Sequence, residues 1–71
     1  DEAILWQNVR LGENVTVRNS VVGNNSAIGD NTRVTDGSII SDDVVIGKGN
    51  KLEHGVKVWA NKTIEDNAIS F

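Results

Sequence analysis

A repeat of six residues occupies residues 22–57. The sequence there reads VGNNSA, IGDNTR, VTDGSI, ISDDVV, IGKGNK and LEHGVK, so every unit opens with an aliphatic residue. The fourth place of each unit carries Asn, Asp or Gly, the residue types that most readily adopt a positive φ angle. A period of six fits neither a helix nor a single hairpin. The repeat therefore predicts short strands and turns that stack into a solenoid.

The aliphatic series extends well beyond this stretch. It consists of Leu5, Leu11, Val17, Val22, Ile28, Val34, Ile40, Ile46, Leu52, Val58 and Ile64. One step is short, because Val17 and Val22 are five residues apart, and we expect Ser20 to take the small inward place of that shortened turn. The turn residues with positive φ are expected to be Asn8, Asn14, Asn19, Asn25, Asn31, Gly37, Asp43, Gly49, Gly55, Asn61 and Asn67. Asn50 falls at an inward place, where a buried amide must form hydrogen bonds within the stack.

This pattern resembles the hexapeptide-repeat family of left-handed parallel β-helices, in which the aliphatic residue points into a triangular prism and three units make one coil. The resemblance implies an all-β, single-stranded left-handed parallel β-helix of about four coils, with one domain over residues 1–71. Handedness comes from the resemblance alone, since the general preference for right-handed crossovers suggests the opposite. The chain begins Asp1-Glu2-Ala3 without a methionine, so we expect it to be the C-terminal fragment of a longer chain.

Three segments resemble a narrower subgroup. They are residues 4–9 (ILWQNV), 17–23 (VRNSVVG) and 57–66 (KVWANKTIED). These segments are similar to the C-terminal domains of sugar-1-phosphate nucleotidyltransferases, especially mannose-1-phosphate guanylyltransferases, in which Pro is common at the place of Ala60. The resemblance implies an assembly or regulatory module that has no catalytic, cofactor-binding or metal-binding residue of its own. The catalytic domain of the parent chain would serve nucleotide-sugar biosynthesis, transferring a nucleotidyl group to a sugar 1-phosphate with Mg²⁺.

The alternative is an enzyme of the hexapeptide acyltransferase type, with His54 as the general base in a cleft between subunits. His54 is the only histidine and the chain has no cysteine, so a zinc site would need carboxylates or other chains to complete it. His54 takes the third place of its unit, at an outward-pointing turn, and the repeat has no inserted loop to wall an acyl-donor cleft. We therefore favour an exposed corner as the role of His54.

Charge and hydropathy narrow the possible partners. Ten acidic and seven basic residues give a formal charge of −3, which argues against nucleic acid and anionic membranes as partners. No run of residues is long enough to span a bilayer, and no signal peptide is evident. We expect a cytoplasmic location.

The three faces of such a prism differ in chemistry. If every third unit lies on one face, alternation along the strands assigns the outward side chains. One face presents Ile4, Trp6, Val21, Gly23, Ile39, Ser41, Lys57 and Trp59, and is mostly apolar. A second face is flat and rich in glycine, and the third presents Thr16, Arg18, Arg33, Thr35, Lys51 and Glu53, which we expect to be solvated. Clustered outward aromatic and aliphatic residues are typical of interfaces. We therefore expect Ile4, Trp6, Val21, Ile39 and Trp59 to pair with a second copy of the helix or to dock the catalytic domain of the parent chain.

Overall fold

Eleven short strands follow one another in residues 3–69, the part of the chain that the computed structural model describes. The strands are β1 (Ala3–Leu5), β2 (Arg10–Leu11), β3 (Thr16–Val17), β4 (Ser20–Val22), β5 (Ala27–Ile28), β6 (Arg33–Val34), β7 (Ile39–Ile40), β8 (Val45–Ile46), β9 (Lys51–Leu52), β10 (Lys57–Val58) and β11 (Thr63–Ile64). No helix is present in this part of the chain. The prediction of an all-β chain is confirmed.

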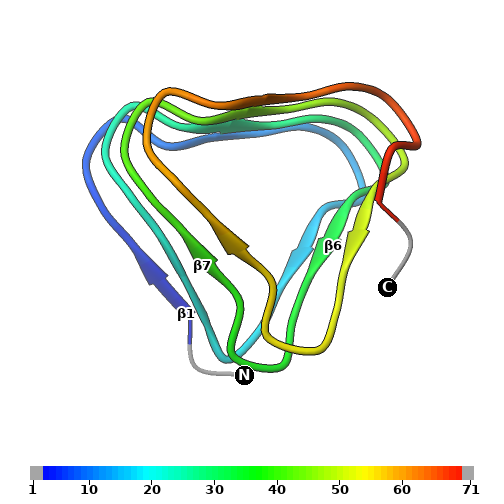
Figure 1. Ribbon diagram of the computed structural model, residues 1–71, viewed down its shortest axis with the longest axis horizontal. Helices are drawn as coiled ribbons and strands as arrows, with labels where there is room; N and C mark the ends of the chain where they lie inside the picture. Colours follow the sequence, from blue (N-terminus) through cyan, green and yellow to red (C-terminus); the bar gives the residue numbers. More distant parts are fainter. Residues whose placement is uncertain (1–2, 70–71) are drawn as a thin grey trace.

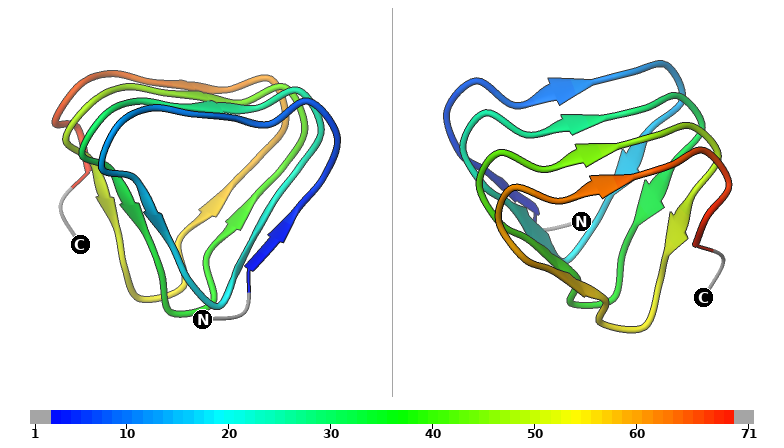
Figure 2. Two further views of the ribbon diagram at one scale, coloured as in Figure 1. Left: turned by 180° about the vertical axis from the view of Figure 1, so that it is seen from behind. Right: turned by 45° about the horizontal axis from the view of Figure 1, so that its top comes forward.

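The strands form three parallel sheets that are the three walls of a triangular prism (Figure 1). The sheets have the orders β1-β4-β7-β10, β2-β5-β8-β11 and β3-β6-β9. Successive coils advance from blue to red toward the viewer in Figure 1 while the chain runs clockwise, which is a left-handed winding, and the view from behind in Figure 2 agrees. With three strands per turn, eleven strands make three complete turns and two further strands. The predicted four coils were therefore a slight overestimate.

The aliphatic series fills the prism. Parallel pairing places Ile28 beside Leu11 and Ile46, and it places Ile46 beside Ile64. The middle members of the series are almost completely buried, with exposed fractions of 6% or less. They are Val22, Ile28, Val34, Ile40, Ile46, Leu52 and Val58. Burial of each such side chain contributes about 1.5–3 kcal/mol, and these contacts hold the coils together.

Burial at the N-terminal end of the prism differs from the prediction. Leu5 and Leu11 occupy inward places of the series, yet they are 45% and 42% exposed. Both belong to the first coil, where no earlier coil of the described chain covers them. At the other end Ile69 packs against the core, and its backbone N–H donates to the Oδ1 of Asn50 over 2.8 Å. The same sequence pattern thus gives a buried or an exposed side chain depending on the coil above or below it.

Left-handed backbone conformations mark every predicted turn. All eleven predicted turn residues have positive φ, from Asn8 at 61° to Asn67 at 55°. Asn19 has a φ of 50° in the shortened turn, and Ser20 is buried there as expected. Asp36 and His54 also have positive φ, at 58° and 82°, which the repeat did not predict. Each precedes a glycine at the same corner of the prism, so this corner has two consecutive left-handed residues in two of its coils.

Polar side chains inside the prism are paired with backbone groups of their own coil and of neighbouring coils. Asn50 is fully buried and donates through Nδ2 to the carbonyl oxygens of Gly47 and Glu65, over 3.1 and 3.0 Å. The predicted hydrogen bonding of Asn50 within the stack is therefore confirmed. Asp42 acts differently, from a turn on the outside, where its Oδ1 accepts the backbone N–H of Asn24 over 2.8 Å. The bonds from Asn50 to Glu65 and from Asn24 to Asp42 join neighbouring coils.

Candidate functional site

The sheet β1-β4-β7-β10 carries the face that the sequence marked as an interface. We call Ile4, Trp6, Val21, Ile39 and Trp59 the Trp face. Strand pairing aligns the outward residues of this sheet in two columns that run along the prism. The aliphatic column consists of Ile4, Val21, Ile39 and Lys57, and the Trp column consists of Trp6, Gly23, Ser41 and Trp59. The register therefore places the two tryptophans at opposite ends of one column.

The Trp face is apolar and largely open to solvent. Trp59 is 72% exposed and Trp6 is 58% exposed, while Ile4 and Ile39 are 55% and 42% exposed. Val21 lies between these two isoleucines and is half-buried. The chain has only three aromatic residues, so two of them project from one wall of the prism. An exposed cluster of this kind is typical of an interaction surface.

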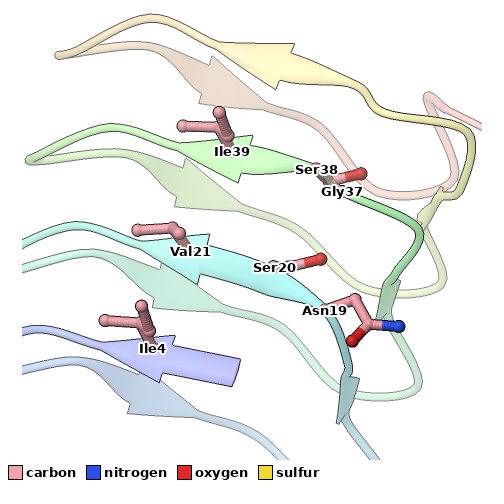
Figure 3. A pocket seen from close by; sticks show the side chains of 7 residues that line it. All are labelled: Ile4, Asn19, Ser20, Val21, Gly37, Ser38 and Ile39. Carbon is pink, nitrogen blue, oxygen red and sulfur yellow. The ribbon is translucent and has the colours of Figure 1, made fainter. Parts of the chain in front are cut away.

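A shallow groove lies beside the aliphatic column, at the corner where the chain enters this sheet (Figure 3). It is lined by Ile4, Asn19, Ser20, Val21, Gly37, Ser38 and Ile39. The groove has two local causes. The turn at Asn19 lacks one residue relative to the next coil, and a Cβ atom at Gly37 would meet no atom within 4 Å. Sequence reasoning did not predict this groove, although the five-residue step from Val17 to Val22 was the signal for it.

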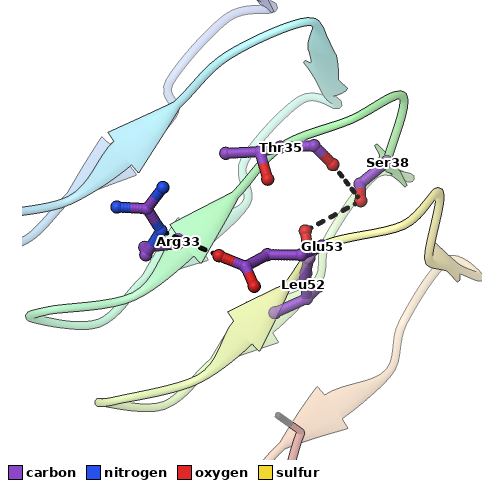
Figure 4. A network of polar contacts seen from close by, with 5 residues as sticks. All are labelled: Arg33, Thr35, Ser38, Leu52 and Glu53. Atoms are coloured by element: carbon purple, nitrogen blue, oxygen red, sulfur yellow. Dashed lines mark hydrogen bonds and ion pairs between the residues drawn. The ribbon is translucent and has the colours of Figure 1, made fainter. Parts of the chain in front are cut away.

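The face of β3, β6 and β9 is polar and forms a network with the interior (Figure 4). Arg33 Nε donates to Glu53 Oε2 over 2.9 Å, and both side chains are partly exposed. Behind them, Ser38 Oγ lies 2.8 Å from the carbonyl oxygen of Thr35 and 2.9 Å from that of Leu52. Thr35 was expected to be solvated, but it is buried. The expectation was wrong because the longer Arg18 and Glu53 side chains flank Thr35 in the same column.

His54 is an exposed corner residue, as the favoured interpretation expected. Its φ of 82° places it in a left-handed turn, and it lines none of three surface depressions found in residues 3–69. In those residues no three His, Asp or Glu side chains gather closely enough to hold a metal ion. The same part of the chain contains no helix of the length and apolarity that a membrane span requires.

The fold and its open apolar wall define a left-handed parallel β-helix module. The family model for the GMPPB C-terminal domain matches residues 1–70, and the chain belongs to this family. It is therefore a module of a mannose-1-phosphate guanylyltransferase-like protein. No curated protein and no solved structure matches the chain. The alternative of an acyltransferase with His54 as general base is not favoured.

Proposed function

We propose that this chain is the assembly module of a cytoplasmic, mannose-1-phosphate guanylyltransferase-like enzyme, and that the Trp face is its contact surface. The module forms a homo-oligomer or docks onto the catalytic domain of its own parent chain, and neither nucleic acid nor a membrane is its partner. Family membership supports the parent enzyme. The catalytic domain carries out nucleotidyl transfer with Mg²⁺, and the residues of this module take no chemical part.

The exposure of the Trp face is the observation that carries this proposal. Trp6 and Trp59 stand out from a flat wall of paired strands. Tryptophan is enriched among the residues that contribute most to binding energy at interfaces. A rigid sheet also holds such side chains without further loss of backbone entropy, so more of the contact energy remains for binding.

The size of the Trp face limits the strength of the contact. Four residues along four strands project about 250 Å² from the usual strand spacings, whereas a standard interface buries about 800 Å² per partner. The Trp face alone therefore makes a weak contact. In the parent chain a tethered partner acts at a high effective concentration, about millimolar for a short linker, and a small contact then suffices.

Replacement of both tryptophans in the full-length protein tests the proposal. We expect Trp6→Ser with Trp59→Ser to shift the protein to a smaller species in sedimentation velocity, or to loosen the catalytic domain so that proteolysis separates it faster. Val45→Ser is the matched control, because Val45 is an exposed aliphatic residue on a different face. Circular dichroism monitors the fold of every variant. Unchanged assembly and unchanged proteolysis in a folded double variant would refute the proposal.

A further inference from the structure

The two columns of the β1-β4-β7-β10 sheet differ in side-chain size at each level of the prism. In the two middle coils, Val21 and Ile39 of the aliphatic column stand beside Gly23 and Ser41 of the Trp column. In these two coils the large side chains therefore lie in the aliphatic column and the small ones in the Trp column. A partner surface that fits this wall needs the opposite order, with large side chains over Gly23 and Ser41 and small ones over Val21 and Ile39.

Two face-to-face orientations can be compared, with the two-fold axis parallel to the prism or to the strands, and only the first gives a second copy of this wall that opposite order in the middle coils. A two-fold axis parallel to the prism exchanges the columns and keeps the coils level. The facing pairs are then Ile4 with the partner's Trp6, Val21 with the partner's Gly23, Ile39 with the partner's Ser41, and Lys57 with the partner's Trp59. Large residues face small ones in both middle coils. In an isologous contact each of these pairs occurs twice.

The other face-to-face orientation fits poorly. A two-fold axis parallel to the strands keeps the columns and reverses the coils. In the two middle coils it sets Val21 against the partner's Ile39 and Gly23 against the partner's Ser41, so large residues meet in one column and small ones in the other. It also sets the Lys57 ammonium against the partner's Ile4. A charge desolvated against an aliphatic side chain is unfavourable.

Charge favours the first orientation as well. Lys57 is exposed at the end of the aliphatic column, level with Trp59, which is 72% exposed. The axis parallel to the prism sets each Lys57 against the indole of the partner's Trp59. A lysine ammonium over a tryptophan ring is a favourable cation–π contact. Size and charge therefore select the same arrangement.

We infer that the occupant of the Trp face is a second copy of this chain, related by a two-fold axis parallel to the prism. This inference rests on the proposed function and adds the identity and orientation of the partner. The shape of the wall allows it, because the strands of this sheet run nearly parallel to one another in Figure 1, and two sheets with little twist can match strand by strand. The two projected areas sum to about 500 Å², below the usual range of stable complexes, so the isolated module forms a weak, concentration-dependent dimer.

An exchange of side chains between the columns tests the orientation. Ile39→Ser leaves two small residues facing each other, and Ser41→Ile sets two large ones against each other. We expect each single variant to weaken association about tenfold in sedimentation equilibrium run up to about 1 mM chain. The double variant exchanges large and small residues on both copies and restores the fit. Its affinity should return to within about threefold of the original.

Lys57 provides a second measurement that does not alter packing in the middle coils. Lys57→Gln should weaken association about fivefold or more, since the contact occurs twice, and Lys57→Arg should keep it. Thr63→Ile on the neighbouring sheet is the control for added surface bulk and should leave association unchanged. Urea unfolding shows that each variant is folded.

The outcomes separate this inference from the proposed function. Recovery of affinity in the Ile39→Ser, Ser41→Ile double variant supports the inference. If the double variant dimerises no more tightly than the weaker of the two single variants, the proposed orientation is overturned. Loss of assembly in the full-length tryptophan variant would still support the Trp face as a contact surface. If the folded module forms no dimer at about 1 mM, a second copy is not the partner, even where the catalytic domain docks on the same face.

Discussion

Replacement of Ile46 by Ala tests how the prism is held together. Ile46 is 2% exposed and lies between Ile28 and Ile64 in register, so truncation leaves a cavity that two flanking coils line. Truncations of this kind cost about 2–5 kcal/mol. A domain of this size has a total stability of about 4–10 kcal/mol at the usual value per residue. We therefore expect Ile46→Ala to remove a large fraction of the free energy of unfolding.

Arg33→Ala is the contrasting variant. The Arg33 side chain is 42% exposed and its ion pair with Glu53 is a surface pair, which is worth about 1 kcal/mol or less. Urea unfolding followed by circular dichroism measures both changes. With a slope of about 1 kcal/mol per molar urea, Ile46→Ala should lower the midpoint by about 2–5 M, and Ile46→Val by about 0.5–1.5 M. Equal midpoints for Ile46→Ala and Arg33→Ala would refute the packing of this core.

Three further predictions concern the turns and the interior. Gly29→Ala should destabilise the fold by about 1–3 kcal/mol, because its Cβ would lie 2.6 Å from the carbonyl carbon of Gly47. Gly37→Ala should cost about 1–2 kcal/mol from its positive φ alone. The urea midpoints of the two variants compare these costs. Asn50→Ala should cost about 1–3 kcal/mol, because the backbone N–H of Ile69 loses its acceptor and the carbonyl oxygens of Gly47 and Glu65 each lose one donor; thermal unfolding measures the loss. His54→Ala in the full-length protein should leave the rate of nucleotidyl transfer unchanged, since loss of a general base would lower a rate by about 10²–10⁴.

The repeat predicted the local structure of this chain well, because each coil is built from short-range rules. An aliphatic residue every six positions was sufficient to identify the inward side chains, and Asn or Gly at the fourth place identified the left-handed turns. Asn50 could also be placed, since a polar residue at an inward position must find partners inside the prism.

Properties that depend on neighbouring coils could not be predicted in the same way. Leu11 and Ile28 occupy equivalent places in the repeat, yet Leu11 is exposed and Ile28 is buried, because only Ile28 has a coil on both sides. Thr35 is buried by the longer side chains of the coils before and after it. The groove beside the Trp face likewise arises from a missing turn residue in one coil and a glycine in the next.

The pairing of the two columns also needed the structure. The sequence indicated an apolar wall, and it placed Trp6 and Trp59 on it. The observed register aligned these residues between coils, so that Ile4, Val21, Ile39 and Lys57 form one column and Trp6, Gly23, Ser41 and Trp59 form the other. Complementarity between two copies follows from this alignment, and six-residue spacing alone does not establish it.

Covering of the Trp face in the assembled protein is the central claim, and thiol labelling at Ser41 tests it most directly. Ser41 lies between the two tryptophans in the middle of the Trp column, and the chain has no cysteine of its own. We predict that a Ser41→Cys variant reacts with a maleimide about tenfold or more slowly in the assembled full-length protein than in the dilute 71-residue module, since burial raises the barrier to reaction. A Thr63→Cys variant on the neighbouring sheet should react at the same rate in both. Equal rates at Ser41→Cys in the assembled protein and in the dilute module would contradict the account.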